Sequence, residues 1–173
     1  MRLTRLCGTA AATALLALAT AATPASAAPL AGQDSAFLKA VHQSNLAEIA
    51  AGQDARSHAT SACVKRVADI LVRDHTRLDA QGMALARSKG VSLPGTPTAA
   101  QRRQLAAVKA HQGTAAYDSA WLEAQEKGHT QTLALIDTEL SKGTDAKVRA
   151  AARTARPIVA MHLQMVRGGV CHA

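Results

Sequence analysis

Three histidines and several carboxylates recur near the middle of segments whose apolar spacing is typical of amphipathic helices. The stretch LVRDHTRLDA at residues 71–80, for example, places an aspartate directly before a histidine. When each segment is turned by about 100° per residue, these polar side chains fall on the apolar face or at its margin. The set comprises Glu48, Asp74, His75, Glu126, His129 and His162. Helices packed side by side could bring these side chains together in the core.

Two kinds of structure fit this set of side chains. The three imidazoles of His75, His129 and His162, with Glu48 or Asp74, would suit one divalent transition metal ion such as zinc, copper or iron. The same groups could instead form a buried hydrogen-bond network that fixes the register of the helices. The sequence leaves both interpretations open.

The elements that would position these residues are helices. Beyond residue 33 the chain is rich in Ala, Leu, Gln, Lys and Arg and has almost no β-branched clusters, which favours an all-α fold. Asp34 is a candidate N-cap of the first helix, and Gly90 and Gly143 are expected to follow the ends of the second and third. The four long helices are predicted over about residues 34–56, 60–89, 114–142 and 144–167, with a short helix over 98–111.

The connection over about residues 90–113 is the only long one, and it determines the topology. A loop of some ten residues followed by a short helix can span the height of a bundle, so we predict that it crosses from one end to the other. The fourth long helix then ends beside the start of the second, which predicts a disulfide between Cys63 and Cys171. In a simple up-down-up-down bundle these cysteines would lie roughly 30–40 Å apart.

The N-terminus has the pattern of a secretory signal peptide. Arg2 and Arg5 precede an apolar run over about residues 10–22, and Ala25-Ser26-Ala27 forms a cleavage site. No later stretch reaches the roughly 18 apolar residues of a membrane-spanning helix. We therefore expect an exported protein, secreted or in the cell envelope and not transmembrane. The predicted divisions are a signal peptide at 1–27, a short flexible linker at 28–33, the bundle at 34–167 and a C-terminal tail at 168–173.

The chain is basic, with a formal net charge of +8 at pH 7. Its basic residues are scattered over outward helix positions, and Phe37, Tyr117 and Trp121 are the only aromatic side chains that could stack on bases. Specific nucleic-acid binding is therefore not expected. Weak electrostatic association with an anionic envelope polymer or lipid remains open.

No complete catalytic motif occurs in the chain. It has no Gly-rich phosphate loop, nucleophile elbow, Cys-x-x-Cys or His-Glu-x-x-His, so the sequence does not decide whether the protein is an enzyme. His42, His58 and His111 are predicted to be peripheral.

Four stretches together resemble an exported bacterial family known as domain of unknown function 4142. They are FLKAVHQSNLAEIAAGQ, VADILVRDHTRLDAQGMALARSKGVSLP, YDSAWLEAQEKGHTQTLALID and ARPIVAMHLQMV. The resemblance covers about residues 34–166 and implies a ferritin-like four-helix bundle with no established activity. Ferritin-like di-iron sites use a Glu from each of two helices and a Glu-x-x-His from each of the other two. Here only Glu126 and His129 form that motif, because Val72 and Val159 stand three residues before His75 and His162.

Too few carboxylates remain for two irons, so a single ion is the metal alternative. The leading functional hypothesis is an exported, envelope-associated or stress-associated binding protein whose polar His/Glu centre holds one metal. A metal-dependent oxidoreductase or a metal storage or sequestration protein is the alternative. A purely structural polar core without metal is the second alternative.

Overall fold

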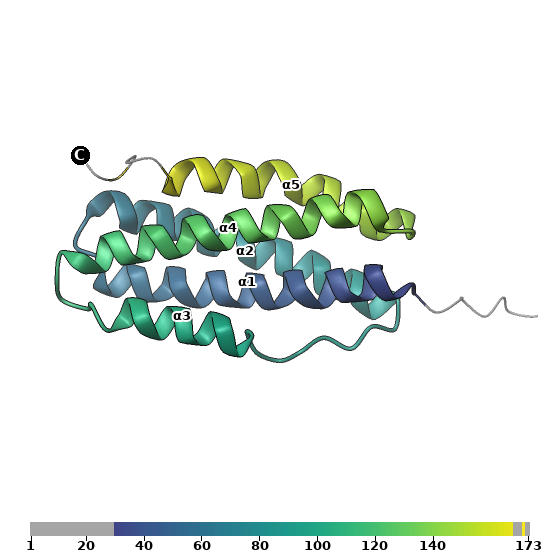
Figure 1. Ribbon diagram of the computed structural model, residues 1–173, viewed down its shortest axis with the longest axis horizontal. Helices are drawn as coiled ribbons and strands as arrows, with labels where there is room; N and C mark the ends of the chain where they lie inside the picture. The colour runs from purple at the N-terminus through teal and green to yellow at the C-terminus, as the bar shows by residue number, and fades with distance from the viewer. Residues whose placement is uncertain (1–29, 168–170, 172–173) are drawn as a thin grey trace, which may run out of the picture.

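The computed structural model describes residues 30–167 and 171, and within them the chain is all-helical (Figure 1). This confirms the predicted all-α bundle. The helices are α1 (Gly32–His58), α2 (Ala62–Ser88), α3 (Ala99–Lys109), α4 (Ala116–Lys142) and α5 (Ala146–Val166). The predicted signal peptide lies outside the described residues, and α1 already begins inside the segment 28–33 that was expected to be a linker.

The bundle consists of two helical hairpins packed side by side. Helix α1 packs along α2, α4 packs along α5, and the hairpins meet where α1 contacts α4 and α2 contacts α5. After α2 the chain crosses the whole length of the bundle before α4 begins, and α3 in this connection packs against α1 and α4 (Figure 1). The predicted long crossover between the second and third long helices is therefore present.

Local side-chain acceptors explain where several helices begin. The Ser61 hydroxyl accepts hydrogen bonds from the backbone N–H groups of Cys63 and Val64 at the start of α2. Thr98 and Gln101 form a reciprocal capping box at the start of α3. These bonds satisfy N–H groups that the first helical turn leaves without partners. The α2 helix ends before Gly90, whose φ of 67° is a conformation that glycine adopts without steric cost.

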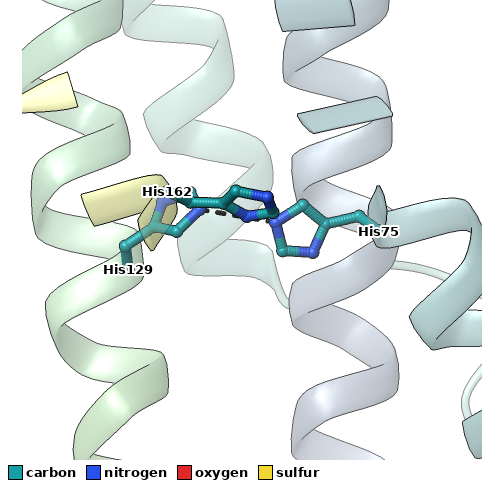
Figure 2. A group of neighbouring side chains, drawn as sticks. All are labelled: His75, His129 and His162. Carbon is teal, nitrogen blue, oxygen red and sulfur yellow. Dashed lines mark hydrogen bonds between the residues drawn. The ribbon is translucent and has the colours of Figure 1, made fainter. Parts of the chain in front are cut away.

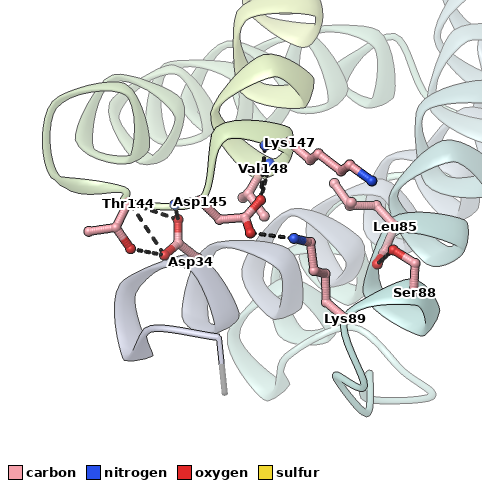
Figure 3. Close-up of polar contacts among 8 residues, drawn as sticks. All are labelled: Asp34, Leu85, Ser88, Lys89, Thr144, Asp145, Lys147 and Val148. Carbon is pink, nitrogen blue, oxygen red and sulfur yellow. Dashed lines mark hydrogen bonds and ion pairs between the residues drawn. The ribbon is translucent and has the colours of Figure 1, made fainter. Parts of the chain in front are cut away.

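The sequence predicted Asp34 as the N-cap of α1, and this was wrong, because the N-cap is Ala31. The buried Asp34 carboxylate instead accepts bonds from the backbone N–H groups of Thr144 (3.0 Å) and Asp145 (3.0 Å) and from the Thr144 hydroxyl (2.9 Å) (Figure 3). Asp145 in turn caps α5, and it pairs with Lys89 at the end of α2 (Figure 3). The α1 helix starts earlier, at Gly32, so that Asp34 lies inside it and ties α1 to the α4–α5 turn.

The opposite end of the bundle is joined by cysteines. Cys63 at the start of α2 and Cys171 beyond the end of α5 lie at disulfide-bonding distance, with Sγ atoms 2.11 Å and Cα atoms 5.5 Å apart. This contact agrees with the crossover topology, which places the end of α5 beside the start of α2. None of the helices in the described part of the chain is long and apolar enough to span a membrane.

The apolar core is divided into two clusters, one towards each end of the bundle. One contains Leu71, Trp121 and Leu163, and the other contains Phe37 and Ile136. Between these clusters the helices bury polar side chains at the same level. The fold thus places a polar layer across the middle of an otherwise apolar interior.

Candidate metal centre

The polar layer contains three imidazoles that converge from three helices. His75 of α2, His129 of α4 and His162 of α5 are 2%, 1% and 0% exposed. Their ring centroids form a nearly equilateral triangle with sides of 5.4, 5.1 and 5.5 Å, and Figure 2 shows the rings turned towards one another. One nitrogen from each ring lies within 4.8 Å of the corresponding nitrogens of the other two. Three histidines grouped in this way could hold a metal ion.

The tautomer of His75 follows from its neighbours. The Asn45 amide donates from Nδ2 to Asp79 Oδ1 at 3.5 Å. A carboxylate oxygen accepts hydrogen bonds and has none to donate, which fixes the orientation of the amide. The Asn45 Oδ1 therefore faces His75 Nδ1, at 2.9 Å, and Nδ1 must donate. His42 Nδ1 bonds the same Asp79 oxygen at 2.7 Å, which holds that carboxylate in place. With its proton on Nδ1, neutral His75 carries a lone pair on Nε2.

His129 is oriented in the same way by the backbone. Its Nδ1 donates to the carbonyl oxygen of Gln125, one turn earlier in α4, at 2.8 Å. A carbonyl oxygen only accepts, so the His129 Nε2 also carries a lone pair. The Nε2 atoms of His75 and His129 face each other at 3.4 Å. In these tautomers two lone pairs meet there, so the contact drawn as a dashed line in Figure 2 becomes a hydrogen bond only when one of the rings carries a proton on Nε2.

His162 completes the triangle from the opposite side. Its Nε2 donates to Asp74 Oδ2 at 3.1 Å, while its buried Nδ1 has no hydrogen-bond partner among the described residues. The Arg73 guanidinium bonds the Asp74 carboxylate and lowers the pKa of Asp74 to about 2, so that this carboxylate stays ionised behind the ring. An ionised acceptor on one ring nitrogen increases the basicity of the other nitrogen.

Burial disfavours the charged form of two of the imidazoles, His75 and His162. Burial lowers the pKa of His75 well below its ordinary value, and the neighbouring His129 and His162 lower it further. Burial also lowers the pKa of His162, although the bond to Asp74 acts in the opposite direction. In their neutral form the three rings present lone pairs to one small volume. A lone pair buried without a donor or a cation costs free energy, on the order of 1–3 kcal/mol.

The nitrogen separation also fits an ion. Zinc binds histidine nitrogen at about 2.0–2.1 Å in tetrahedral geometry, which separates two ligand nitrogens by roughly 3.4 Å. The His75 and His129 nitrogens are 3.4 Å apart. No fourth His, Cys, Asp or Glu joins the group within the part of the chain that the structure describes.

The carboxylates predicted from the sequence lie outside this triangle. Asp74 contacts His162 from behind, and Glu48 Oε1 lies 3.8 Å from Nδ1 of His129, on the side of the ring away from His75. Burial raises the pKa of Glu48, while His129 acts to lower it. The Glu126 side chain is 44% exposed and lies 3.8 Å from Arg167. The structure thus brings together the three predicted histidines and places none of the three predicted carboxylates among them.

Four groups that orient the imidazoles were not among the predicted site residues. They are Asn45, Asp79, His42 and the backbone carbonyl of Gln125. Asn45 falls near the centre of the apolar face of its helix, which was a usable signal. His42 was predicted to be peripheral, and this was wrong: its ring is buried against Asp79, because the helix turns it towards α2.

One known protein family matches most of the chain. The family model of a domain of unknown function, DUF4142, matches residues 19–168. The chain belongs to this family. Neither the curated proteins nor the solved structures gave a match to the chain.

Proposed function

We propose that this DUF4142 protein binds a single divalent transition metal ion through His75 Nε2, His129 Nε2 and His162 Nδ1. The observation that carries the proposal is the hydrogen bonding of the opposite nitrogens. His75 and His129 donate from Nδ1 to Asn45 and to a backbone carbonyl, and their Nε2 atoms face each other. His162 donates from Nε2 to Asp74, and its buried Nδ1 has no partner among the described residues. A structural network would instead pair donors with acceptors inside the triangle.

Zinc is the ion that the centre fits best. The donors are three imidazole nitrogens, with the hard carboxylates held behind the rings and not beside the ion, and the 3.4 Å between the His75 and His129 nitrogens matches a tetrahedral site. Copper would compete for the same nitrogens, since it binds such sites more tightly than zinc. Iron would be expected to need a carboxylate in the set. When bound, the ion would stabilise the fold by joining α2, α4 and α5.

Because the three histidines are buried, the centre is better suited to binding an ion than to catalysing the reaction of a substrate. The three side chains are at most 2% exposed and lie between two apolar clusters. We therefore propose metal binding or sequestration as the biochemical role. A second candidate is a metal-dependent enzyme, because a set of three protein ligands leaves one coordination position for water or a substrate.

The role is proposed for an exported protein. The N-terminal segment has the charge and apolar pattern of a signal peptide, and the Cys63–Cys171 contact suits an oxidising compartment. In such a compartment a buried centre of this kind would hold metal within the cell envelope or outside the cell.

Cobalt titration tests the proposal. Metal-free protein is titrated with Co²⁺, whose visible absorption is strong in tetrahedral sites and weak in octahedral ones, and Zn²⁺ is then added to displace it. We expect saturation at one equivalent, loss of binding in His129→Ala, and unchanged binding in His111→Ala, a change at an exposed position. A spectrum that stays octahedral and is the same in all three proteins would refute the assignment. A shift of the bound-cobalt spectrum on adding azide would favour the enzyme candidate.

A further inference from the structure

A groove separate from the histidine centre runs between α3 and α4. Its volume is about 600 Å³, within the range of roughly 300–1,000 Å³ that is usual for ligand pockets. None of the three converging histidines lines it. The crossover helix α3 forms one wall, so the groove exists because of the long connection (Figure 1). Its apolar lining consists of small side chains from both helices: Ala100, Ala107, Val108, Ala120 and Ala124.

Two cationic side chains line the groove, one from each wall. Arg103 of α3 and Lys127 of α4 are both exposed, and neither has a hydrogen-bond or ion-pair partner within the part of the chain that the structure describes. The Gln104 amide of α3 donates to the Ala124 carbonyl of α4 at 3.1 Å, which sets the register of the two helices. Because α3 and α4 run in opposite directions, Arg103 and Lys127 lie on the same side of this contact (Figure 1). The two cations therefore share one end of the groove.

The other ionisable side chains of the lining limit the charge of a ligand. Glu123 lies one helical turn before Lys127 on α4, and His111 lies beyond the end of α3. With His111 neutral, two positive charges and one negative charge leave the lining with one net positive charge. This charge complements an anion that carries a single negative charge, and Glu123 disfavours one that carries two.

We propose that this groove binds a medium-chain fatty acid as its carboxylate, with the carboxylate between Arg103 and Lys127 and the alkyl chain along the small apolar side chains. A guanidinium donates two parallel hydrogen bonds to a carboxylate, and charge-assisted bonds are about twice as strong as neutral ones. Arg103 and His111 are separated by roughly 12 Å at 1.5 Å per residue, which accommodates an alkyl chain of about eight carbons.

Calorimetric titration with three ligands of equal length tests this inference. Octanoate, octanol and octylammonium differ only in the end group that meets Arg103 and Lys127. We expect octanoate to bind roughly fivefold more tightly than octanol, as two exposed ion pairs allow, and octylammonium to bind most weakly. Salt should reduce the preference for octanoate, because it screens exposed charges. Equal affinities for the three ligands at low salt, or no binding of octanoate, would overturn the proposal.

Paired charge variants distinguish the groove from the general positive charge of the chain. Arg103→Gln/Lys127→Gln should lower the affinity for octanoate to that for octanol and leave octanol binding unchanged. Lys65→Gln/Arg66→Gln removes the same net charge at two exposed positions outside the groove, and it should keep the preference. A preference that survives in the first variant, or that both variants lose equally, would refute the assignment.

Matched tryptophan variants show where the alkyl chain lies. Ala107→Trp fills part of the groove and should weaken octanoate binding at least tenfold. Ala106→Trp changes the neighbouring exposed position of α3, which does not line the groove, and it should leave binding intact. Circular dichroism checks that both variants are folded. Octanoate binding that is undiminished in folded Ala107→Trp would exclude this groove as the site.

Titrations with and without zinc separate the groove from the histidine centre. The fatty-acid proposal predicts the same affinity in chelator-treated and in zinc-loaded protein, and it holds even if the chain binds no metal. Binding of octanoate seen only with zinc would mean that the carboxylate coordinates the ion, and it would contradict the groove assignment.

Discussion

Glu139 of α4 should make the stability of the protein depend on pH between about pH 4.5 and pH 7. Its carboxyl group is 0% exposed and lies beside that of Asp34, with Gln33 donating to its Oε2 at 3.2 Å. Burial, followed by the bond to Asp34, raises the pKa of Glu139 from 4.5 to about 7. In this range the folded protein holds a proton that the unfolded chain has already released.

The sign and size of the effect follow from this difference. A group whose pKa is raised on folding stabilises the protein at low pH, and the contribution is lost as the pH rises through the folded pKa. The free energy of unfolding should therefore fall by up to roughly 3 kcal/mol between pH 4.5 and pH 7 and then level off. Titration of Asp34 does not contribute to the change in stability between pH 4.5 and pH 7. Its pKa is lowered, since bonds from Asp145 and Thr144 outweigh its desolvation, so its contribution is lost only as the pH falls below about 3.8.

Urea denaturation of metal-free protein at a series of pH values measures the effect. Glu139→Gln imitates the protonated carboxyl group, because the amide can donate to Asp34 and accept from Gln33. Its stability should lack this decline, so the variant gains on the wild type as the pH rises to 7. Asp137→Asn is the control, since the bond from Arg156 lowers the pKa of this exposed carboxyl group and its effect lies below the tested range. Parallel curves for the wild type and Glu139→Gln would show that the reasoning about this buried pair is wrong.

Three further perturbations test other parts of the structure. A Cβ atom on Gly52 would lie 2.6 Å from Val72 Cγ2, whereas one on Gly82 meets nothing within 4 Å. Gly52→Ala should therefore destabilise the bundle, and Gly82→Ala should stabilise it by about 0.5–1 kcal/mol. Urea denaturation measures both changes. Asp74→Asn removes the ionised acceptor behind the ring and should weaken zinc binding about 10–100-fold in a competition assay, whereas equal affinity would contradict its orienting role. Cys63→Ser opens a link across 108 residues and should lower stability by up to about 4–5 kcal/mol, an effect that reduction of the wild type should reproduce.

The helices were predictable because their signals are local. Ser61 and Thr98 cap the helices that directly follow them, and the long connection between the second and third long helices left few ways to join the elements. Asp34 failed as a predicted cap because a carboxylate can serve a helix that is distant in sequence. It bonds the backbone of Thr144, which lies 110 residues further along the chain. Nothing in the sequence around Asp34 indicates that partner.

The three histidines were predictable because a polar residue on an apolar helix face must be buried. Their acceptors were harder to predict, since Asp79 acts through Asn45 and the partner of His129 is a backbone carbonyl, which has no sequence signature. Glu126 was at the margin of its apolar face, where a small rotation decides between core and solvent, and the side chain lies at the surface.

The measurement that tests the metal centre most directly is the metal content of the protein as the cell makes it. The full chain, with its N-terminal segment and no affinity tag, is produced in a bacterial host, purified without chelator and analysed by elemental mass spectrometry. We expect close to one equivalent of zinc or another transition metal in the wild type and none in His75→Ala/His129→Ala, with helicity retained. A wild type that carries no metal, even after incubation with zinc, copper and iron, would contradict the proposal and leave the three histidines as a structural polar layer.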